Sequence, residues 1–219
     1  MRTRGVTSQP LATGARSAPS LAKWFLLALV GFLVLAGFGV AGSYNDLVAR
    51  EQAVRAQWGQ VENVYQRRAD LVPNLVATVK GAAAFEKETY VAVAEARARA
   101  GQMSAASVDK LINDPAAFER FAKAQEGLGA ALSRLLVVAE RYPDLQATAG
   151  FRDLQAQLEG TENRITVERM RFNEAAQAFN TRRQRFPTVF IAGLFGSRFN
   201  EKPYFEGRAG AAEAPKVTF

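Results

Sequence analysis

The chain has 219 residues, with 28 lysine and arginine residues against 21 aspartate and glutamate residues, and a formal charge of +7. It contains no cysteine and no histidine, which excludes disulfide bonds, thiolate nucleophiles, imidazole acid–base chemistry and the usual transition-metal ligands. Four basic residues and no acid fall in residues 1–23, so the remainder is nearly balanced and gives weak support for nucleic-acid binding.

Residues 1–23 are rich in small and polar residues and lack apolar periodicity, which predicts a disordered basic tail. Residues 24–42 form the uncharged run WFLLALVGFLVLAGFGVAG. As a helix this run spans roughly 28 Å, close to the thickness of a bilayer core. The alternative is a cleaved signal peptide, whose apolar region is only about 7–15 residues long. A retained transmembrane helix is therefore the favoured interpretation.

Basic residues near the two ends of this span predict its orientation. Arg2, Arg4, Arg16 and Lys23 precede it, whereas the nearest basic residues after it are accompanied by acids. The positive-inside rule then favours a cytoplasmic N-terminus and a domain on the extracytoplasmic side.

Residues 43–187 carry helical patterns throughout. We expect helices over about 43–82, 85–100, 115–141 and from about 145 to Pro187, with Gly101 closing the second helix and a loop over 103–114. The last helix has the cleanest signal, because one apolar residue recurs every seven positions: Phe151, Leu158, Ile165, Phe172, Phe179 and Phe186. Such a repeat indicates knobs-into-holes packing. The prediction is an all-α chain with an antiparallel up-and-down four-helix bundle.

Two polar interruptions mark the first and last of these helices. Arg68 lies on the otherwise apolar stripe of the first helix, and polar residues 160–163 interrupt the last one. Counting 24 residues from each helix end at the same side of the bundle brings Arg68 level with Glu162, which predicts an ion pair in the core. The simpler interpretation is a buried polar layer that fixes helix register, and the other is a ligand or partner site. The candidate residues are Arg67, Arg68, Asp70, Pro73, Asn74, Glu162 and Asn163.

Residues 188–206 form an apolar segment too short to span a bilayer, and residues 207–219 read as a disordered tail. We expect the segment to pack at the membrane-proximal end of the bundle, with residues 190–195 near residues 43–55 and far from the Gly101–Pro115 loop. There it would either plug the bundle or contact the lipid interface. The candidate membrane-proximal patch comprises Arg182, Arg183, Arg185, Phe190, Ile191, Leu194 and Phe195.

No stretch of the sequence carries a catalytic pattern. There is no phosphate-binding loop, dinucleotide fingerprint or nucleophile with a base, and the spacing of Glu86 and Glu88 puts them on different helix faces. Arg182, Arg183 and Arg185 suit a helix C-terminus and a solvated face better than a nucleic-acid site. We therefore expect no catalytic residues, no metal and no cofactor.

Several motifs resemble those of the LemA family, over about Ser43 to Glu206. They are Tyr44-Asn45-x-Leu47-Val48, Arg67-Arg68-x-Asp70-Leu71-Val72-Pro73-Asn74-Leu75-Val76 with Thr78-Val79-Lys80-Gly81, Ala131-Leu132-Ser133-Arg134-Leu135-Leu136, Tyr142-Pro143-Asp144-Leu145, Leu158-Glu159-Gly160-Thr161-Glu162-Asn163-Arg164-Ile165, Phe172-Asn173, Phe179-Asn180, Phe186-Pro187 and Ile191-Ala192-x-Leu194-Phe195-Gly196. Phe85-Glu86 departs from the His-Glu often found in the family. The resemblance implies a membrane-anchored helical bundle of unresolved molecular role.

From these features we expect a single-pass protein of the bacterial inner membrane, acting as a non-enzymatic scaffold that binds envelope proteins or further copies of itself. One alternative is a bundle with a polar core site for a small ligand or peptide, which requires a pocket at Arg68 and Glu162. The other is a binder of anionic lipid or nucleic acid, which requires binding that weakens steeply with salt.

Overall fold

The computed structural model describes residues 21–82 and 87–207, and within these ranges the chain is helical, with connecting segments and no strand. The chain divides into two compact units, Met1–Gly42 and Ser43–Phe219. The predicted disorder of residues 1–20 and 208–219 lies outside the described residues, as does Phe85-Glu86.

The first unit contributes the opening part of α1 (Leu21–Ala82). Its described residues, 21–42, are all exposed, and the helix is long and apolar enough to cross a membrane. The sequence pattern separated this span from the next helix at Ser43, but α1 runs on without a break. No proline lies between residues 24 and 72, so nothing in the backbone forces an interruption there.

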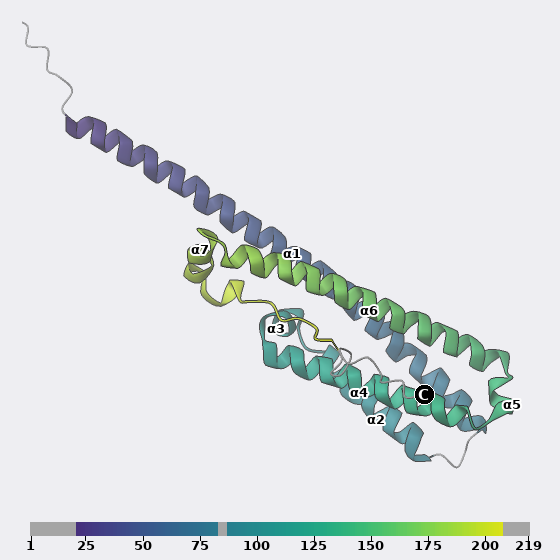
Figure 1. Cartoon of the computed structure of the whole chain (residues 1–219). Coiled ribbons are helices and arrows are strands. Elements are labelled where there is room, and N and C mark those ends of the chain that lie inside the picture. Colours follow the sequence, from purple (N-terminus) through teal and green to yellow (C-terminus); the bar gives the residue numbers. More distant parts are fainter. Residues whose placement is uncertain (1–20, 83–86, 208–219) are drawn as a thin grey trace, which may run out of the picture. The chain divides into compact units, whose positions relative to one another are not determined.

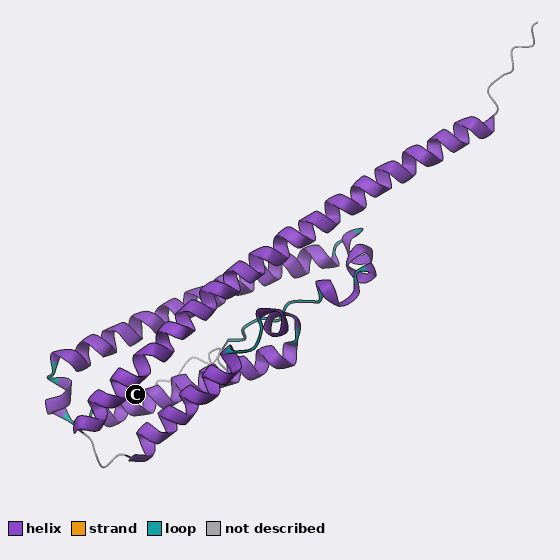
Figure 2. Cartoon of the chain, turned by 180° about the vertical axis from the view of Figure 1, so that it is seen from behind, coloured by secondary structure: helices purple, strands orange, loops and turns teal. Residues whose placement is uncertain are grey.

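The second unit is a four-helix bundle made by the rest of α1, α2 (Lys87–Ser104), α4 (Pro115–Ala139) and α6 (Ala149–Gln184) (Figures 1 and 2). Three short helices, α3 (Val108–Asn113), α5 (Pro143–Gln146) and α7 (Thr188–Leu194), and the 3₁₀ helix η1 (Gly196–Phe199) connect or follow them. The predicted all-α class and the helical bundle are confirmed.

Contacts between α1 and α6 show that these helices are antiparallel. Gln57 hydrogen-bonds Glu168 at 2.6 Å, and further along α1, Arg68 pairs with the earlier residue Glu162 at 3.1 Å. The predicted α1 stripe is buried wherever it is described, and α1 continues through Pro73. The seven-residue repeat of α6 is buried from Phe151 to Phe179, whereas the last member, Phe186, is 80% exposed because α6 ends at Gln184.

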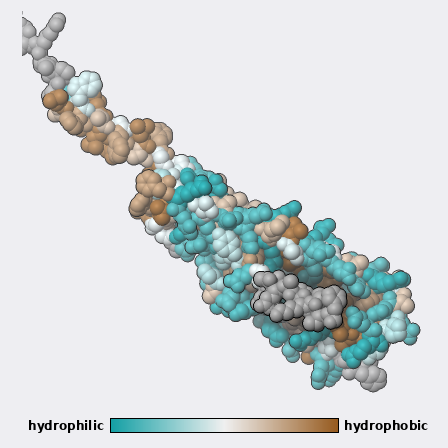
Figure 3. Space-filling view, viewed as in Figure 1, coloured by the Kyte–Doolittle hydropathy of each residue, from teal (hydrophilic) through white to brown (hydrophobic). Residues whose placement is uncertain are grey.

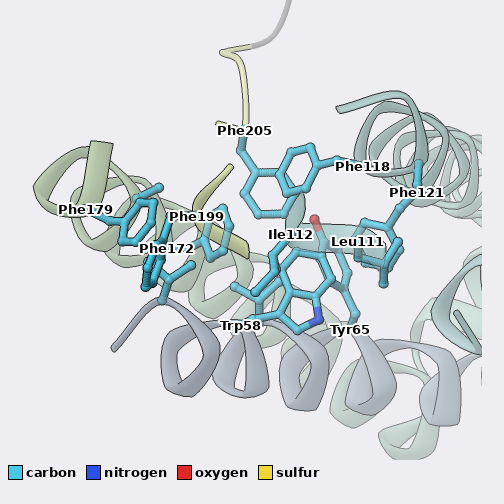
Figure 4. Close-up of a cluster of buried hydrophobic side chains, with 14 of the residues drawn as sticks. Trp58, Tyr65, Leu111, Ile112, Phe118, Phe121, Phe172, Phe179, Phe199 and Phe205 are labelled. Carbon is cyan, nitrogen blue, oxygen red and sulfur yellow. The ribbon is translucent and has the colours of Figure 1, made fainter. Parts of the chain in front are cut away.

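An aromatic cluster occupies the core of the bundle half nearer Ser43 (Figure 4). Trp58 on α1 lies 5.1 Å from Phe121 and 5.4 Å from Phe172, measured between ring centroids. Phe205, from the C-terminal end of the described chain, stacks on Trp58 at 6.1 Å. The core is thus closed by a segment that contains no regular secondary structure.

The predicted loop over residues 103–114 is wrong in two respects. Helix α2 passes through Gly101 to Ser104, and α3 follows, capped by the Ser107 hydroxyl, which accepts from the Lys110 backbone N–H at 3.4 Å. Asp114 caps α4 as expected from its position before Pro115, and its carboxylate accepts from the Ala116 N–H at 2.9 Å. After α4, residues Pro143–Gln146 form the short helix α5, with Tyr142 at its N-cap.

The expected separation of the C-terminal segment from the Gly101–Pro115 loop is also wrong. Phe195 does meet Tyr44, with ring centroids 4.8 Å apart, but Lys202, further along the same segment, donates to Asn113 of α3 at 2.5 Å, and Asp109 of α3 pairs with Arg55 of α1. In an up-and-down bundle the second connection returns to the end where the first helix begins. Proximity to both regions therefore agrees with antiparallel α1 and α6.

Residues 200–207, here called the strap, leave this end of the bundle and run back along α6. Asn180 bonds the backbone of Lys202, and Asn173 bonds the backbone of Phe205 in the same way. Arg169 donates to the carbonyl of Glu206 at 3.0 Å. As the residue number rises along the strap, the residue number of the α6 partner decreases, so the strap is antiparallel to α6.

Candidate functional site

Arg68 forms the centre of a polar cluster between α1, α4 and α6. Its side chain is only 4% exposed, and Nη1 donates to Glu162 Oε1 at 3.1 Å. Nη2 donates to the backbone oxygen of Gln125 at 2.9 Å and to its side-chain oxygen at 2.6 Å. The guanidinium also lies 5.0 Å from the Tyr65 ring centre. Charge-assisted bonds and a ring face together make burial of this cation tolerable.

The structure brings Arg68 and Glu162 together, but the pair is not buried symmetrically. The Glu162 side chain is 43% exposed, because it lies on the wall of an open groove. The neighbouring polar residues do not interrupt α6, since Thr161 is buried and satisfies its hydroxyl with the Gln157 carbonyl at 2.7 Å. The pair therefore has its cation in the bundle core and its carboxylate in contact with solvent.

A groove of about 1140 Å³ runs between α4 and α6 beside this cluster, bounded at one end by strap residues 204–207. Its polar lining includes Arg68, Gln125 and Glu162, and its apolar lining includes Leu132, Leu158, Ile165 and Phe205. The volume is at or above the range of typical ligand pockets, about 300–1,000 Å³.

The remaining polar candidates are not part of the Arg68 cluster. Asp70 is exposed and accepts from Gln66 at 2.8 Å, and Pro73 and Asn74 are exposed as well. A two-residue step along a helix turns a side chain by about 200°, which carries Asp70 away from the core. Arg67 lines a smaller groove of about 550 Å³ between α1 and α6, and Asn163 lines both grooves.

Two buried groups have shifted pKa values. Burial raises the pKa of the Tyr65 hydroxyl above its ordinary value, against the opposing effect of Arg169 and Arg68. Burial lowers the pKa of Lys202, although Glu51 opposes this shift. Lys202 donates to Glu51 at 3.2 Å and to Asn113 at 2.5 Å, and its side chain is completely inaccessible to solvent.

The apolar end of the bundle presents a different surface (Figure 3). Phe190 is 70% exposed, Leu194 80% and Phe195 42%, whereas Ile191 points inward and is only 6% exposed. Two of the basic residues assigned to this patch have internal partners, since Arg182 pairs with Asp46 at 2.5 Å and Arg183 donates to the Phe199 carbonyl at 2.6 Å.

Sequence reasoning missed the strap and the residues that hold it. Asn173 and Asn180 appeared only as members of family-like motifs, without a role. Their signal was present, because asparagine is unfavourable inside a helix and these two are seven residues apart beside buried phenylalanines. Glu51 and Lys202 gave no comparable signal, since their contact joins positions 151 residues apart.

Taken together, these elements have the features of a binding surface. The described residues contain no group of three carboxylates that could hold a metal ion. The groove instead combines an apolar floor with hydrogen-bonding and charged side chains, which is the usual composition of a recognition surface.

Comparisons with known proteins give similar sequences and a family match. The chain is 28% identical over 189 residues to magnetosome proteins MamQ 1 and MamQ 2 of Paramagnetospirillum magneticum, covering 80% of this chain and 68% of each relative. It is also 28% identical over 211 residues to magnetosome protein MamQ of Magnetospirillum gryphiswaldense, covering 88% and 74% respectively. The LemA family model matches residues 57–219, and the chain belongs to the LemA family.

Proposed function

We propose that the protein is a single-pass, membrane-anchored and non-enzymatic interaction module whose bundle meets the lipid interface through its apolar end. The carrying observation is the set of exposed apolar side chains at that end: Phe186, Val189, Phe190, Leu194 and Phe195. Monomeric soluble proteins rarely leave such side chains gathered together unless they contact a partner or a membrane.

The anchor in this proposal is the apolar stretch at the start of α1. Residues 21–42 are exposed, and their composition suits a hydrocarbon environment. Arg2, Arg4, Arg16 and Lys23 precede the stretch, which supports a cytoplasmic N-terminus and a bundle on the extracytoplasmic face of the bacterial inner membrane. Protease digestion of spheroplasts tests this side: the bundle is cleaved without permeabilisation, and protection would reverse the orientation.

Interfacial contact follows from the short chain length between the span and the patch. Tyr44 comes two residues after Gly42 and touches Phe195, with ring centroids 4.8 Å apart. Phe195 therefore stays within a few residues' reach of the membrane surface. Ile191 and Ala192 are buried, while Phe190 and Leu194 are exposed, which supports a short helix that both closes the bundle end and contacts lipid.

The absence of histidine and cysteine and of a nucleophile–base pattern supports a non-enzymatic role. In an interaction module, the surfaces left for protein partners or for self-association are the grooves on the bundle sides. This function predicts that the purified protein has no hydrolase or transferase turnover.

Site-specific quenching tests the lipid contact. Because the chain has no cysteine, a single Leu194→Cys variant can carry an environment-sensitive fluorophore in full-length protein reconstituted in liposomes. We expect a blue-shifted emission that brominated lipids quench. The matched control is Val137→Cys. Val137 is also apolar and is 59% exposed, but it lies near the C-terminus of α4, at the other end of the bundle from Leu194. Equal quenching at both positions, or quenching at neither, would contradict interfacial contact.

A further inference from the structure

We infer that the groove between α4 and α6 binds an extended, basic polypeptide segment of a partner protein. This inference deepens the proposed interaction module and rests on it for its setting, but it uses a different surface from the apolar end. It also goes beyond the Arg68–Glu162 pair itself, since it concerns the groove floor and its outer walls.

The strap shows how this face of α6 holds extended polypeptide. The Asn173 amide donates to the Phe205 carbonyl at 2.8 Å and accepts from the Phe205 N–H at 2.8 Å. The side chain of Phe205 is inserted into the aromatic core, and Arg169 covers its ring at 4.7 Å. Backbone pairing by a side-chain amide, together with an apolar anchor, is a general mode of peptide recognition.

The groove continues past the strap in the same direction. Beyond Arg169, the last residue of α6 that bonds the strap, the lining on α6 continues from Thr166 back to Leu158. These eight positions correspond to about 12 Å of helix. On the α4 side it is floored by Leu132 and Leu136. This length accommodates about four residues of extended chain, and the alternating side chains would contact the floor and the walls in turn.

The negative charge of the groove lining favours a basic occupant. Five glutamates and two arginines line the groove, although the chain as a whole is positive. Both arginines have partners, since Arg68 bonds Glu162 and Gln125 and Arg169 bonds the strap. Among the described residues, the carboxylates of Glu126, Glu159, Glu174 and Glu206 have no cationic partner, although Glu159 accepts a bond from Gln155 at 3.2 Å.

The chemistry also excludes other occupants. Lipid phosphate would be repelled by the four unpaired carboxylates, and a polyamine would leave the apolar floor uncovered. Residues 208–219 of this chain contain Arg208 and Lys216 but also Glu213, so their nearly balanced charge matches the walls poorly. A segment that alternates arginine or lysine with apolar residues matches both floor and walls.

Fluorescence anisotropy tests the proposal with full-length protein in phosphatidylcholine nanodiscs. The probe is a fluorescein-labelled nine-residue peptide of three Arg-Ala-Leu repeats, compared with a Glu-Ala-Leu peptide and with empty nanodiscs. We expect saturable binding of the basic peptide only. Replacing Glu126, Glu159 and Glu174 together by glutamine should weaken binding about tenfold, since each exposed charge pair contributes little alone.

A matched variant controls for net charge. Glu62, Glu88 and Glu140 are exposed and lie outside the groove lining, so their triple glutamine variant has the same charge change and should bind the peptide as strongly as the unaltered chain. Equal weakening by both triple variants, or the absence of saturable binding, would overturn the inference. In either case the lipid quenching at position 194 is unaffected, which separates this failure from failure of the proposed function.

Disulfide trapping locates the peptide. Met170→Cys lies in the groove lining, whereas Val167→Cys, on the same helix, lines the smaller groove toward α1. A basic peptide carrying one cysteine should form a mixed disulfide with the first variant and not with the second. Trapping at position 167 would place the peptide elsewhere. Binding that occurs only after residues 208–219 are deleted would show that the chain's own segment occupies the groove, and would overturn a partner as its occupant.

Discussion

Asn180 holds both backbone groups of Lys202: its amide donates to the Lys202 carbonyl at 2.8 Å, and its oxygen accepts from the Lys202 N–H at 2.8 Å. Both side chains are buried. The same amide reaches the Tyr204 hydroxyl at 2.9 Å. One residue of α6 therefore fixes the position where the strap begins its return along the bundle.

Replacing Asn180 by alanine should destabilise the protein markedly. The substitution leaves a buried N–H and a buried C=O of Lys202 without partners, and each unsatisfied group costs about 1–3 kcal/mol. We expect the free energy of unfolding to fall by about 2 kcal/mol or more in denaturant titrations of detergent-solubilised protein. Asn163→Ala is the control, because Asn163 is exposed on the same helix. Equal effects of the two variants would contradict the clamp.

Phe205→Ala tests whether the strap completes the core. Phe205 is 5% exposed and lies 4.6 Å from Phe118 between ring centroids. Loss of a buried aromatic side chain costs about 3–5 kcal/mol, and opening the stack exposes Trp58. In a Trp24→Phe background, the emission of Trp58 should shift to the red. Tyr204→Ala, at a strap position that is 40% exposed, should leave the emission unchanged, and an unchanged spectrum for Phe205→Ala would contradict the packing.

Glu162→Ala should cost about 2 kcal/mol. Removing one partner of a fully buried ion pair costs about 3–5 kcal/mol, and exposed pairs contribute about 0–1 kcal/mol. This pair lies between these limits, because Arg68 is enclosed while Glu162 reaches solvent. Thermal unfolding measures the loss, and Glu159→Ala, which removes an exposed carboxylate one helical turn away, should fall within about 0.5 kcal/mol of the unaltered chain. Identical melting of both variants would show that the pair adds no stability.

Because Tyr65 is buried, we expect the protein to lose stability at high pH. Its hydroxyl titrates near pH 10 when unfolded, and burial raises its pKa in the folded protein. Above about pH 10 the folded state therefore binds more protons than the unfolded state, so the free energy of unfolding falls as pH rises through this range. Below pH 10 the contribution is fully present.

The Tyr65→Phe variant provides the comparison for this pH dependence. It removes the titrating group and should lose less stability than the unaltered chain between pH 9.5 and 11 in parallel denaturant titrations. The other ionisable groups are common to both proteins, so the difference in slope reports Tyr65. Parallel curves would mean that its hydroxyl is not desolvated.

The regular helices could be predicted because their signals are periodic and local. The α6 repeat and the α1 stripe identified buried faces, and helix counting placed Arg68 beside Glu162 from their distances to the helix ends. The same repeat failed at Phe186, because periodicity does not report that α6 ends at Gln184. A four-residue helix such as α5 or η1 is too short to show a hydrophobic period in the sequence.

The groove and the strap could not be derived in this way. The strap's backbone partners are side chains that lie 22 and 32 residues away in sequence, and no spacing rule connects an extended segment with asparagines on a helix. The groove is lined by residues of α1, α4, α6 and the strap, and local sequence does not encode how such distant segments pack together. The expected distance between the C-terminal segment and the Gly101–Pro115 loop was a different error, since it assigned the second connection to the wrong end of a correctly predicted bundle.

The Glu51–Lys202 contact has a consequence for biosynthesis. Glu51 is translated 151 residues before its partner, which takes roughly 8–30 s at about 5–20 residues per second. During this interval the apolar helix can already be engaged by the membrane, while the early stripe of α1 has neither α6 nor the strap to cover it. The apolar surface around Trp58 therefore stays uncovered until α6 and the strap have been synthesised.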